Sequence, residues 1–187
     1  MRWPIKTSLP SGTSLSHSTT VTYADLVKLD DPPSVTKRDH RYQDVRIPAF
    51  PNTHGLKEGD IVTVTGWLHL VAGEDDGDYH IQISNSKESQ AQCLIVEVPK
   101  DDEVFVKAAL VRERAKTVRE FIREKLLKGN KPSSRGSLMR RPPFVAVTGQ
   151  LFYDDAHVGD APRGKKGCQA ETLWEVHPIT DMKFAPQ

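Results

Sequence analysis

The sequence predicts a mainly β fold with one long helix, arranged as a five-stranded OB-like Greek-key barrel. Short segments after residue 59 alternate between apolar and polar residues, as half-buried strands do. One long amphipathic segment separates the third of these strands from the fourth. Gly66 interrupts the long first strand, at a point where a barrel strand would bend or bulge. The order strand, strand, strand, helix, strand, strand is that of an OB barrel.

The chain of 187 residues has room for one compact domain and an appendage. Residues 1–55 are rich in Ser, Thr and Pro, and we expect an N-terminal arm that packs on the domain without a core of its own. Within the arm, residues 22–29 fit one or two helical turns and residues 45–50 fit an edge strand. Residues 56–187 form the predicted barrel domain.

The first three predicted strands carry polar side chains on their outward faces. In the first strand the alternation places Leu68 and Leu70 on the buried face, with Trp67 and His69 outward. An acidic turn precedes the second strand, in which His80 faces outward, and Glu97 faces outward in the third. The three predicted strands cover residues 61–71, 79–84 and 92–98.

A long helix is predicted to follow the third strand. Asp101, Asp102 and Glu103 place negative charge at its start, and Gly129 fits its C-terminal cap. Its apolar stripe recurs every three or four residues, at Val104, Ala108, Val111, Ala115, Val118, Ile122 and Leu126. An immunoglobulin-like sandwich is the alternative fold, but it needs seven strands and has no place for such a helix. The last two predicted strands cover residues 144–153 and 173–177.

Composition excludes several classes of protein. Lys and Arg number 26 against 25 Asp and Glu, and the mean hydropathy is −0.51, so neither a membrane protein nor a charged tail is expected. The first residues lack the apolar core of a signal peptide, so we expect a soluble cytoplasmic protein; the alternative is an exported protein whose leader is missing from this sequence. The two cysteines, Cys93 and Cys168, permit one disulfide at most.

Three pieces of the sequence together resemble a known group of domains. They are the acidic turn with Asp78-Tyr-His80, the strand end Ile95-Val-Glu-Val-Pro99, and residues 147–157 followed by Glu175-Val-His-Pro178. These motifs are similar to those of a group of uncharacterised bacterial OB-fold-like domains, many of them exported. The resemblance covers roughly residues 59–184. It implies the domain limits, and it implies no activity.

One candidate site combines histidines with carboxylates. In an OB barrel the third strand lies between the second and the fifth, so their outward side chains share one surface. That surface would carry His80, Glu97, Glu175 and His177. Neutral imidazoles and ionised carboxylates bind divalent metals or transfer protons near pH 7, so a metal-dependent hydrolase is one hypothesis. A structural network of hydrogen bonds beneath the arm is the alternative.

The other candidate site is basic. Between residues 112 and 166 the chain has 14 Lys and Arg but 6 Asp and Glu, although the whole chain is nearly neutral. In OB folds, cations follow the phosphates of single strands and aromatic rings stack on bases. The favoured hypothesis is therefore a binding module for single-stranded nucleic acid or another polyanion. Its predicted ligand-binding residues are Trp67, His69, Arg140, Arg141, Arg163, Lys165 and Lys166.

Enzymatic activity is the less favoured class. The sequence has no nucleophile elbow, phosphate-binding loop or dinucleotide glycine pattern. No cofactor is expected for a binding module, whereas the hydrolase hypothesis requires a divalent metal. A third hypothesis is a protein-interaction domain that uses the arm or the long helix, and the sequence leaves the oligomeric state open.

Overall fold

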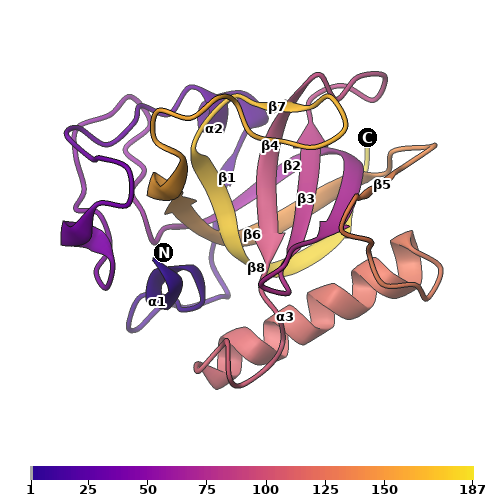
Figure 1. Ribbon diagram of the computed structural model, residues 1–187, viewed down its shortest axis with the longest axis horizontal. Coiled ribbons are helices and arrows are strands. Elements are labelled where there is room, and N and C mark those ends of the chain that lie inside the picture. The colour runs from indigo at the N-terminus through magenta and orange to yellow at the C-terminus, as the bar shows by residue number, and fades with distance from the viewer. Residues whose placement is uncertain (1) are drawn as a thin grey trace.

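The computed structural model describes residues 2–187 and confirms the predicted fold class (Figure 1). Five strands close into a barrel in the order β2, β3, β4, β8, β6, and β6 pairs back onto β2. Strands β4 and β8 are parallel, and the other barrel pairs are antiparallel. The barrel strands are β2 (Ile61–Gly73), β3 (Tyr79–Ser84), β4 (Gln92–Val98), β6 (Phe144–Tyr153) and β8 (Trp174–Phe184).

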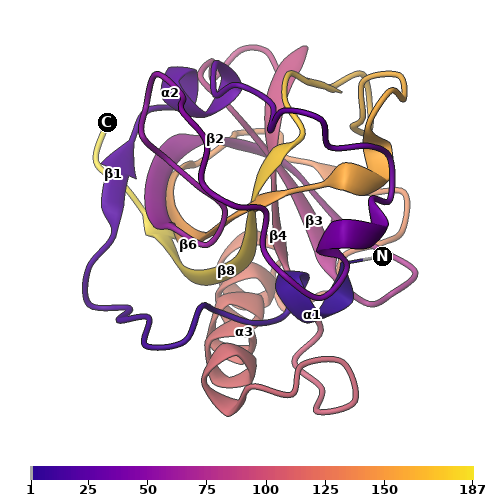
Figure 2. The same ribbon diagram turned by 90° about the vertical axis from the view of Figure 1, so that its left-hand side faces the viewer.

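Short elements decorate this barrel. Strand β1 pairs in parallel with β2, β5 pairs with β2, and β7 pairs with β4. Figure 2 looks at the barrel from the side that the first fifty residues cover, with the long helix α3 below the barrel. The additional elements are α1 (Trp3–Lys6), β1 (Thr19–Val21), α2 (Tyr23–Val27), η1 (His40–Tyr42), β5 (Ser137–Leu138), η3 (Asp155–His157) and β7 (Gln169–Ala170).

Helix α3 (Ala109–Phe121), with the π-helical turn η2 (Ile122–Leu126), starts later than the sequence indicates. The prediction of a helix from residue 101 is wrong. The Asp102 side chain accepts a hydrogen bond from the backbone N–H of Val104, and the Asp102 carbonyl accepts from Phe105 and Val106, which closes a turn instead. Val104 is therefore 72% exposed, and the buried stripe begins at Val111.

The bulge in β2 lies at His69 and not at Gly66. The pairing with β3 shifts between Leu68 and Leu70, so His69 is the extra residue. After the bulge the inward positions change, and Val71 joins the main core cluster in place of Leu70. At Gly66 a side chain would meet the backbone carbonyl of Ser84, so this glycine permits a close approach of two strands.

The first 55 residues share the core of the barrel. Val21, Tyr23, Leu26 and Ile47 are buried in the same cluster as the strand residues. The predicted helical turns appear as α2, capped by a reciprocal pair of hydrogen bonds at its start. Residues 45–50 form no strand and pair with none in the described part of the chain, so the predicted edge strand is wrong.

A buried ion pair holds the beginning of the chain against the barrel. The Arg2 guanidinium donates to both carboxylate oxygens of Glu58, at 2.5 and 2.6 Å, and both side chains are fully buried. Glu58 also accepts hydrogen bonds from the backbone N–H groups of Ile47 and Tyr153. Within residues 2–187 there is no helix that could cross a membrane.

Replacement of Glu58 by Gln is expected to destabilise the protein by about 3–5 kcal/mol, because it leaves the Arg2 charge buried without its counter-charge. Urea unfolding followed by fluorescence measures this change. The matched control is Lys57→Ala, which removes an exposed ion pair to Asp60 and should change stability by less than about 1 kcal/mol. Equal effects of the two substitutions would contradict the role given to the buried pair.

Candidate functional site

The four residues of the predicted metal cluster lie together on one face of the barrel. His80 on β3 pairs across the strands with Glu97 on β4, and its Nδ1 is 3.0 Å from Glu97 Oε1. Glu175 and His177 come from β8, which runs parallel to β4. His177 Nδ1 is 3.2 Å from Glu97 Oε2 and 3.9 Å from Glu175 Oε2. Glu97 is thus the centre of the cluster, with one oxygen toward each imidazole.

Two further residues complete this cluster. Asp78 immediately precedes β3, and its Oδ2 is 3.5 Å from His177 Nε2. Lys6, at the end of α1, brings its Nζ to 3.5 Å from Glu97 Oε2. Asp78 could have been found from its spacing, because residues two apart on a strand share a face and Asp78 is two residues from His80. Nothing in the sequence indicated Lys6, which arrives through the packing of the arm.

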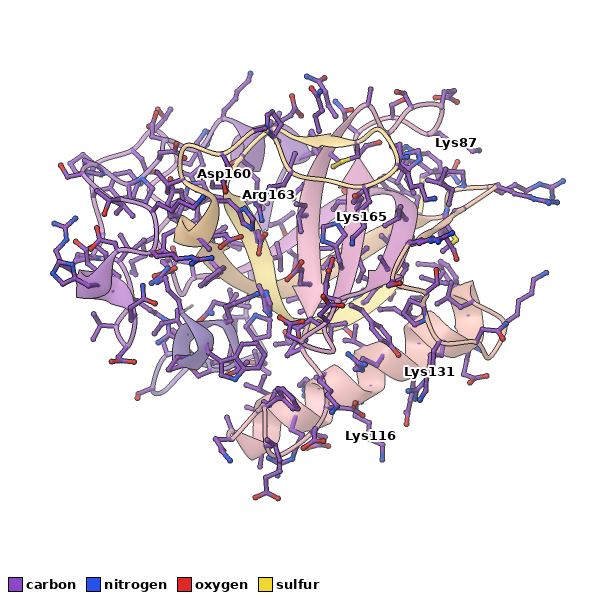
Figure 3. The ribbon with its side chains drawn as sticks, viewed as in Figure 1. Lys87, Lys116, Lys131, Asp160, Arg163 and Lys165 are labelled. Carbon is purple, nitrogen blue, oxygen red and sulfur yellow. A yellow bond between two sulfur atoms is a disulfide. The ribbon has the colours of Figure 1, made fainter. Side chains whose placement is uncertain are left out.

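The loop at residues 154–173 covers the cluster and carries three of the predicted polyanion ligands, Arg163, Lys165 and Lys166 (Figure 3). The Arg163 guanidinium pairs with Glu175 and, at 2.7 Å, with Asp154. Lys165 Nζ lies 3.2 Å from Glu74. Both cations are therefore engaged by carboxylates of this site. Lys166, in the same loop, is exposed.

The remaining predicted polyanion ligands lie elsewhere. Arg140 and Arg141 are exposed in the segment before β6. Trp67 is half-buried against Phe144, at 5.0 Å between ring centroids. His69 is only 6% exposed and its Nε2 is 2.7 Å from the carbonyl of Ser86, so its ring presents no open face for stacking.

A pocket of about 480 Å³ opens above the cluster. This volume lies within the usual range for small-molecule sites. Five carboxylates line the pocket against three basic side chains, so it favours a cationic ligand over a polyanion. The carboxylates are Glu74, Asp75, Asp76, Glu97 and Asp154, the basic residues are Lys6, Arg163 and Lys165, and the histidines are His80 and His157.

Burial and close charges shift the pKa values of this cluster strongly. Burial and the Lys6 ammonium lower the pKa of His177, but the carboxylates of Glu175 and Glu97 outweigh them and raise it to about 9. Burial raises the pKa of Asp78 to about 6, although His177 and Lys6 oppose this. Burial also opposes ionisation of Glu97, yet the Lys6 ammonium and the two imidazoles hold its pKa well below the usual range.

His177 is the most unusual residue of the site. It is fully buried, and neither ring nitrogen has a hydrogen-bond partner among residues 2–187. Asp78 Oδ2 and Glu175 Oε2, which face this ring, are also buried and without partners in the same part of the chain. The Glu97 contact at 3.2 Å and the Asp78 contact at 3.5 Å are misaligned for hydrogen bonds, and the Glu175 contact at 3.9 Å is too long for one. Buried polar groups are almost always satisfied, so these unpaired atoms are the candidate ligands of a bound group.

Two overlapping sets of residues have the spacing of metal ligands. One set is Asp78, Glu97 and His177, and the other is Glu74, His80 and Glu97. Within each set, the ligand atoms all lie within 4.8 Å of one another. Imidazole nitrogen with carboxylate oxygen is a common donor set for divalent transition metals.

The chain matches no protein-family model and no curated protein.

A disulfide fixes the loop that covers the pocket. Cys93 on β4 is bonded to Cys168 in the loop, and the adjoining residues pair as β4 with β7. Gly164, between Arg163 and Lys165, has a φ of +132° and would bring any side chain onto the Cys168 carbonyl. The one disulfide that the cysteine count permits is thus formed, and it holds the basic side of the pocket in place.

The metal-free protein is expected to lose stability as the pH rises from 6.5 to about 9. The pKa of His177 is 6.5 in an unfolded chain and about 9 in the folded one, so its contribution is complete below pH 6.5 and is lost above pH 9. The groups that face it are Asp78, Glu97, Glu175 and Lys6. The free energy of unfolding should fall by a few kcal/mol over this interval.

Urea titrations across this interval measure the fall. His177→Gln should reduce it, whereas His157→Gln, which removes a half-exposed histidine at the pocket rim, should retain it. An undiminished fall in His177→Gln would show that another group is responsible.

Proposed function

We propose that the protein is a divalent-metal-binding barrel domain whose metal centre is built on Asp78, Glu97 and His177. The observation that carries this proposal is the buried His177 ring, with both nitrogens lacking partners and carboxylate oxygens facing each of them. In the neutral His177 ring one nitrogen has a lone pair, and a metal ion held by that nitrogen and by the facing carboxylate oxygens would give these buried groups a partner.

Charge balance supports the same proposal. The cluster contains five carboxylates and three basic side chains, which leaves two negative charges. Two imidazolium groups or a single divalent ion would neutralise them, so metal binding can replace two bound protons. The carboxylates are Glu74, Asp78, Glu97, Asp154 and Glu175, and the basic side chains are Lys6, Arg163 and Lys165.

The ligand types favour a transition metal. Imidazole suits Zn²⁺, Fe²⁺ and Mn²⁺ better than Ca²⁺, which prefers oxygen ligands alone. A metal centre is also what the hydrolase hypothesis requires. Asp78 and His177 are fully buried, however, so this centre by itself offers no position to a substrate, and the function proposed for it is metal binding.

Zn²⁺ or Mn²⁺ is expected to raise the melting temperature of metal-free protein purified without a histidine tag, because the ion binds the folded state alone. Asp78→Asn and His177→Gln should each weaken binding by at least about 100-fold, since they remove ligands. Isothermal titration and thermal shift measure both effects. Asp75→Asn removes the same charge from the exposed part of the turn and should bind like the wild type. Wild-type affinity in Asp78→Asn would reject the proposal.

A second candidate function has support from a separate patch. Lys87 Nζ lies 5.0 Å from the centre of the Trp67 ring, and Arg140 and Arg141 are exposed near the strand end that pairs with Trp67. An aromatic ring among cations is what non-specific binding of single strands requires. We propose this patch, and not the loop with Arg163 and Lys165, as the site for a nucleic acid.

Charge reversal at Arg140 and Arg141 is expected to weaken binding of a labelled oligo(dT) at least tenfold and to reduce its salt dependence, because two phosphate contacts are lost. Fluorescence anisotropy at several salt concentrations measures both. The control is charge reversal at Lys116 and Lys125, which are exposed on α3 and η2. Equal losses in the two double variants would indicate binding by net charge alone.

The disulfide bears on the compartment. Stable disulfides are typical of oxidising compartments, so Cys93–Cys168 favours the exported alternative over a cytoplasmic protein.

A further inference from the structure

A second set of metal ligands lies beside the buried centre and faces the pocket. His80 Nδ1 is 3.0 Å from Glu97 Oε1 and 3.7 Å from Glu74 Oε1. All three residues line the pocket, and the Glu74 side chain is 33% exposed, whereas Asp78 and His177 are closed off. This set therefore has access to solvent and to a ligand.

The hydrogen bonds of Gln82 fix the protonation of the His80 ring. The Gln82 amide nitrogen donates to the Lys165 carbonyl at 3.1 Å and to Gln90 Oε1 at 3.2 Å. The Gln82 oxygen accepts from the Lys165 backbone N–H at 2.5 Å and is 3.1 Å from His80 Nε2. Because this oxygen can only accept, His80 Nε2 carries the hydrogen.

The other nitrogen of His80 lies 3.0 Å from Glu97 Oε1, where either a proton, which makes the ring an imidazolium, or a metal ion fits. In the neutral ring, the Nδ1 lone pair points toward the carboxylates of Glu74 and Glu97. A lone pair that faces two carboxylates needs a positive charge between them, either a proton or a metal ion. Metal-binding histidines characteristically donate their second N–H to an oxygen, as His80 does to Gln82.

We propose that Glu74, His80 and Glu97 bind a second divalent ion, and that Glu97 bridges it to the ion at Asp78 and His177. This inference rests on the proposed function, since the bridge requires the buried centre. The geometry of Glu97 carries it, because Oε1 faces His80 and Oε2 faces His177. Paired metal sites bridged in this way occur in phosphatases and nucleases.

The pocket-facing ion would take an anionic oxygen ligand of the phosphate class. Three protein ligands leave coordination positions open for water and substrate. Two divalent ions carry two more positive charges than the cluster needs for neutrality, and a phosphate supplies the compensating negative charge. Lys165, whose ammonium is 3.2 Å from Glu74 and 30% exposed, can turn from Glu74 toward the bound anion.

Mn²⁺ titration of the metal-free full chain tests this inference. Wild type should bind two Mn²⁺ per chain and give the electron paramagnetic resonance signal of an exchange-coupled pair. Glu74→Gln should bind one Mn²⁺ with the six-line signal of an isolated ion, because its affinity for the second falls by at least about 100-fold. Glu97→Gln should lose both sites, and Asp75→Asn, on the same pocket wall, should keep both.

The outcomes separate this inference from the proposed function. One Mn²⁺ per chain in both wild type and Glu74→Gln would overturn the second site and leave the buried centre standing. No Mn²⁺ in wild type would overturn both.

Inorganic phosphate is the probe for the ligand class, and its binding to Mn²⁺-loaded protein, measured by ³¹P relaxation, should be lost in Glu74→Gln. Equal phosphate binding in Glu74→Gln would reject the phosphate assignment. Glu74 is partly exposed, so Glu74→Gln is not expected to unfold the protein. A melting temperature of this variant equal to that of the wild type verifies that any loss of metal is not caused by unfolding.

Discussion

The need to neutralise charge on one buried barrel face governs the arrangement of the rest of the molecule. Carboxylates from β3, β4 and β8 meet there, and a buried carboxylate is stable only beside an opposite charge or a proton. The barrel strands supply imidazoles but no amine or guanidinium to this face. Those come from outside the barrel, as Lys6 from the arm and Arg163 from the loop before β8. The arm and the loop are therefore parts of the site as well as coverings of the barrel.

The barrel and the centre of the site could be predicted from the sequence because both depend on alternation. Residues that are two positions apart on a strand lie on the same face of the sheet. The strand order then brings His80, Glu97 and His177 together. The start of α3 and the bulge at His69 could not be predicted. The start of α3 depends on the turn that Asp102 forms, and the bulge depends on the register between β2 and β3. The hydrophobic periodicity of the sequence predicts neither of these local features.

The distribution of charge along the sequence was a weaker guide. Arg163 and Lys165 belong to a basic segment, which suggested contact with phosphates. In the folded chain Arg163 pairs with Asp154 at the start of its own loop and with Glu175 on β8, and Lys165 pairs with Glu74, which is remote in sequence. A count of charged residues gives the net charge of a segment but does not show which residues those charges pair with in the folded chain. Arg140 and Arg141 belong to the same basic segment, and yet their side chains are exposed in the folded chain.

The disulfide gives the pocket a dependence on biosynthesis. Its two cysteines are 75 residues apart, and the later one follows most of the barrel along the chain. Strands β2, β3 and β4 can be synthesised and begin to pair before Cys168 exists. The wall that contains Arg163 is held covalently only when the two thiols have joined. Completion of the pocket wall is thus a covalent event that is separate in time from the first pairing of the barrel strands.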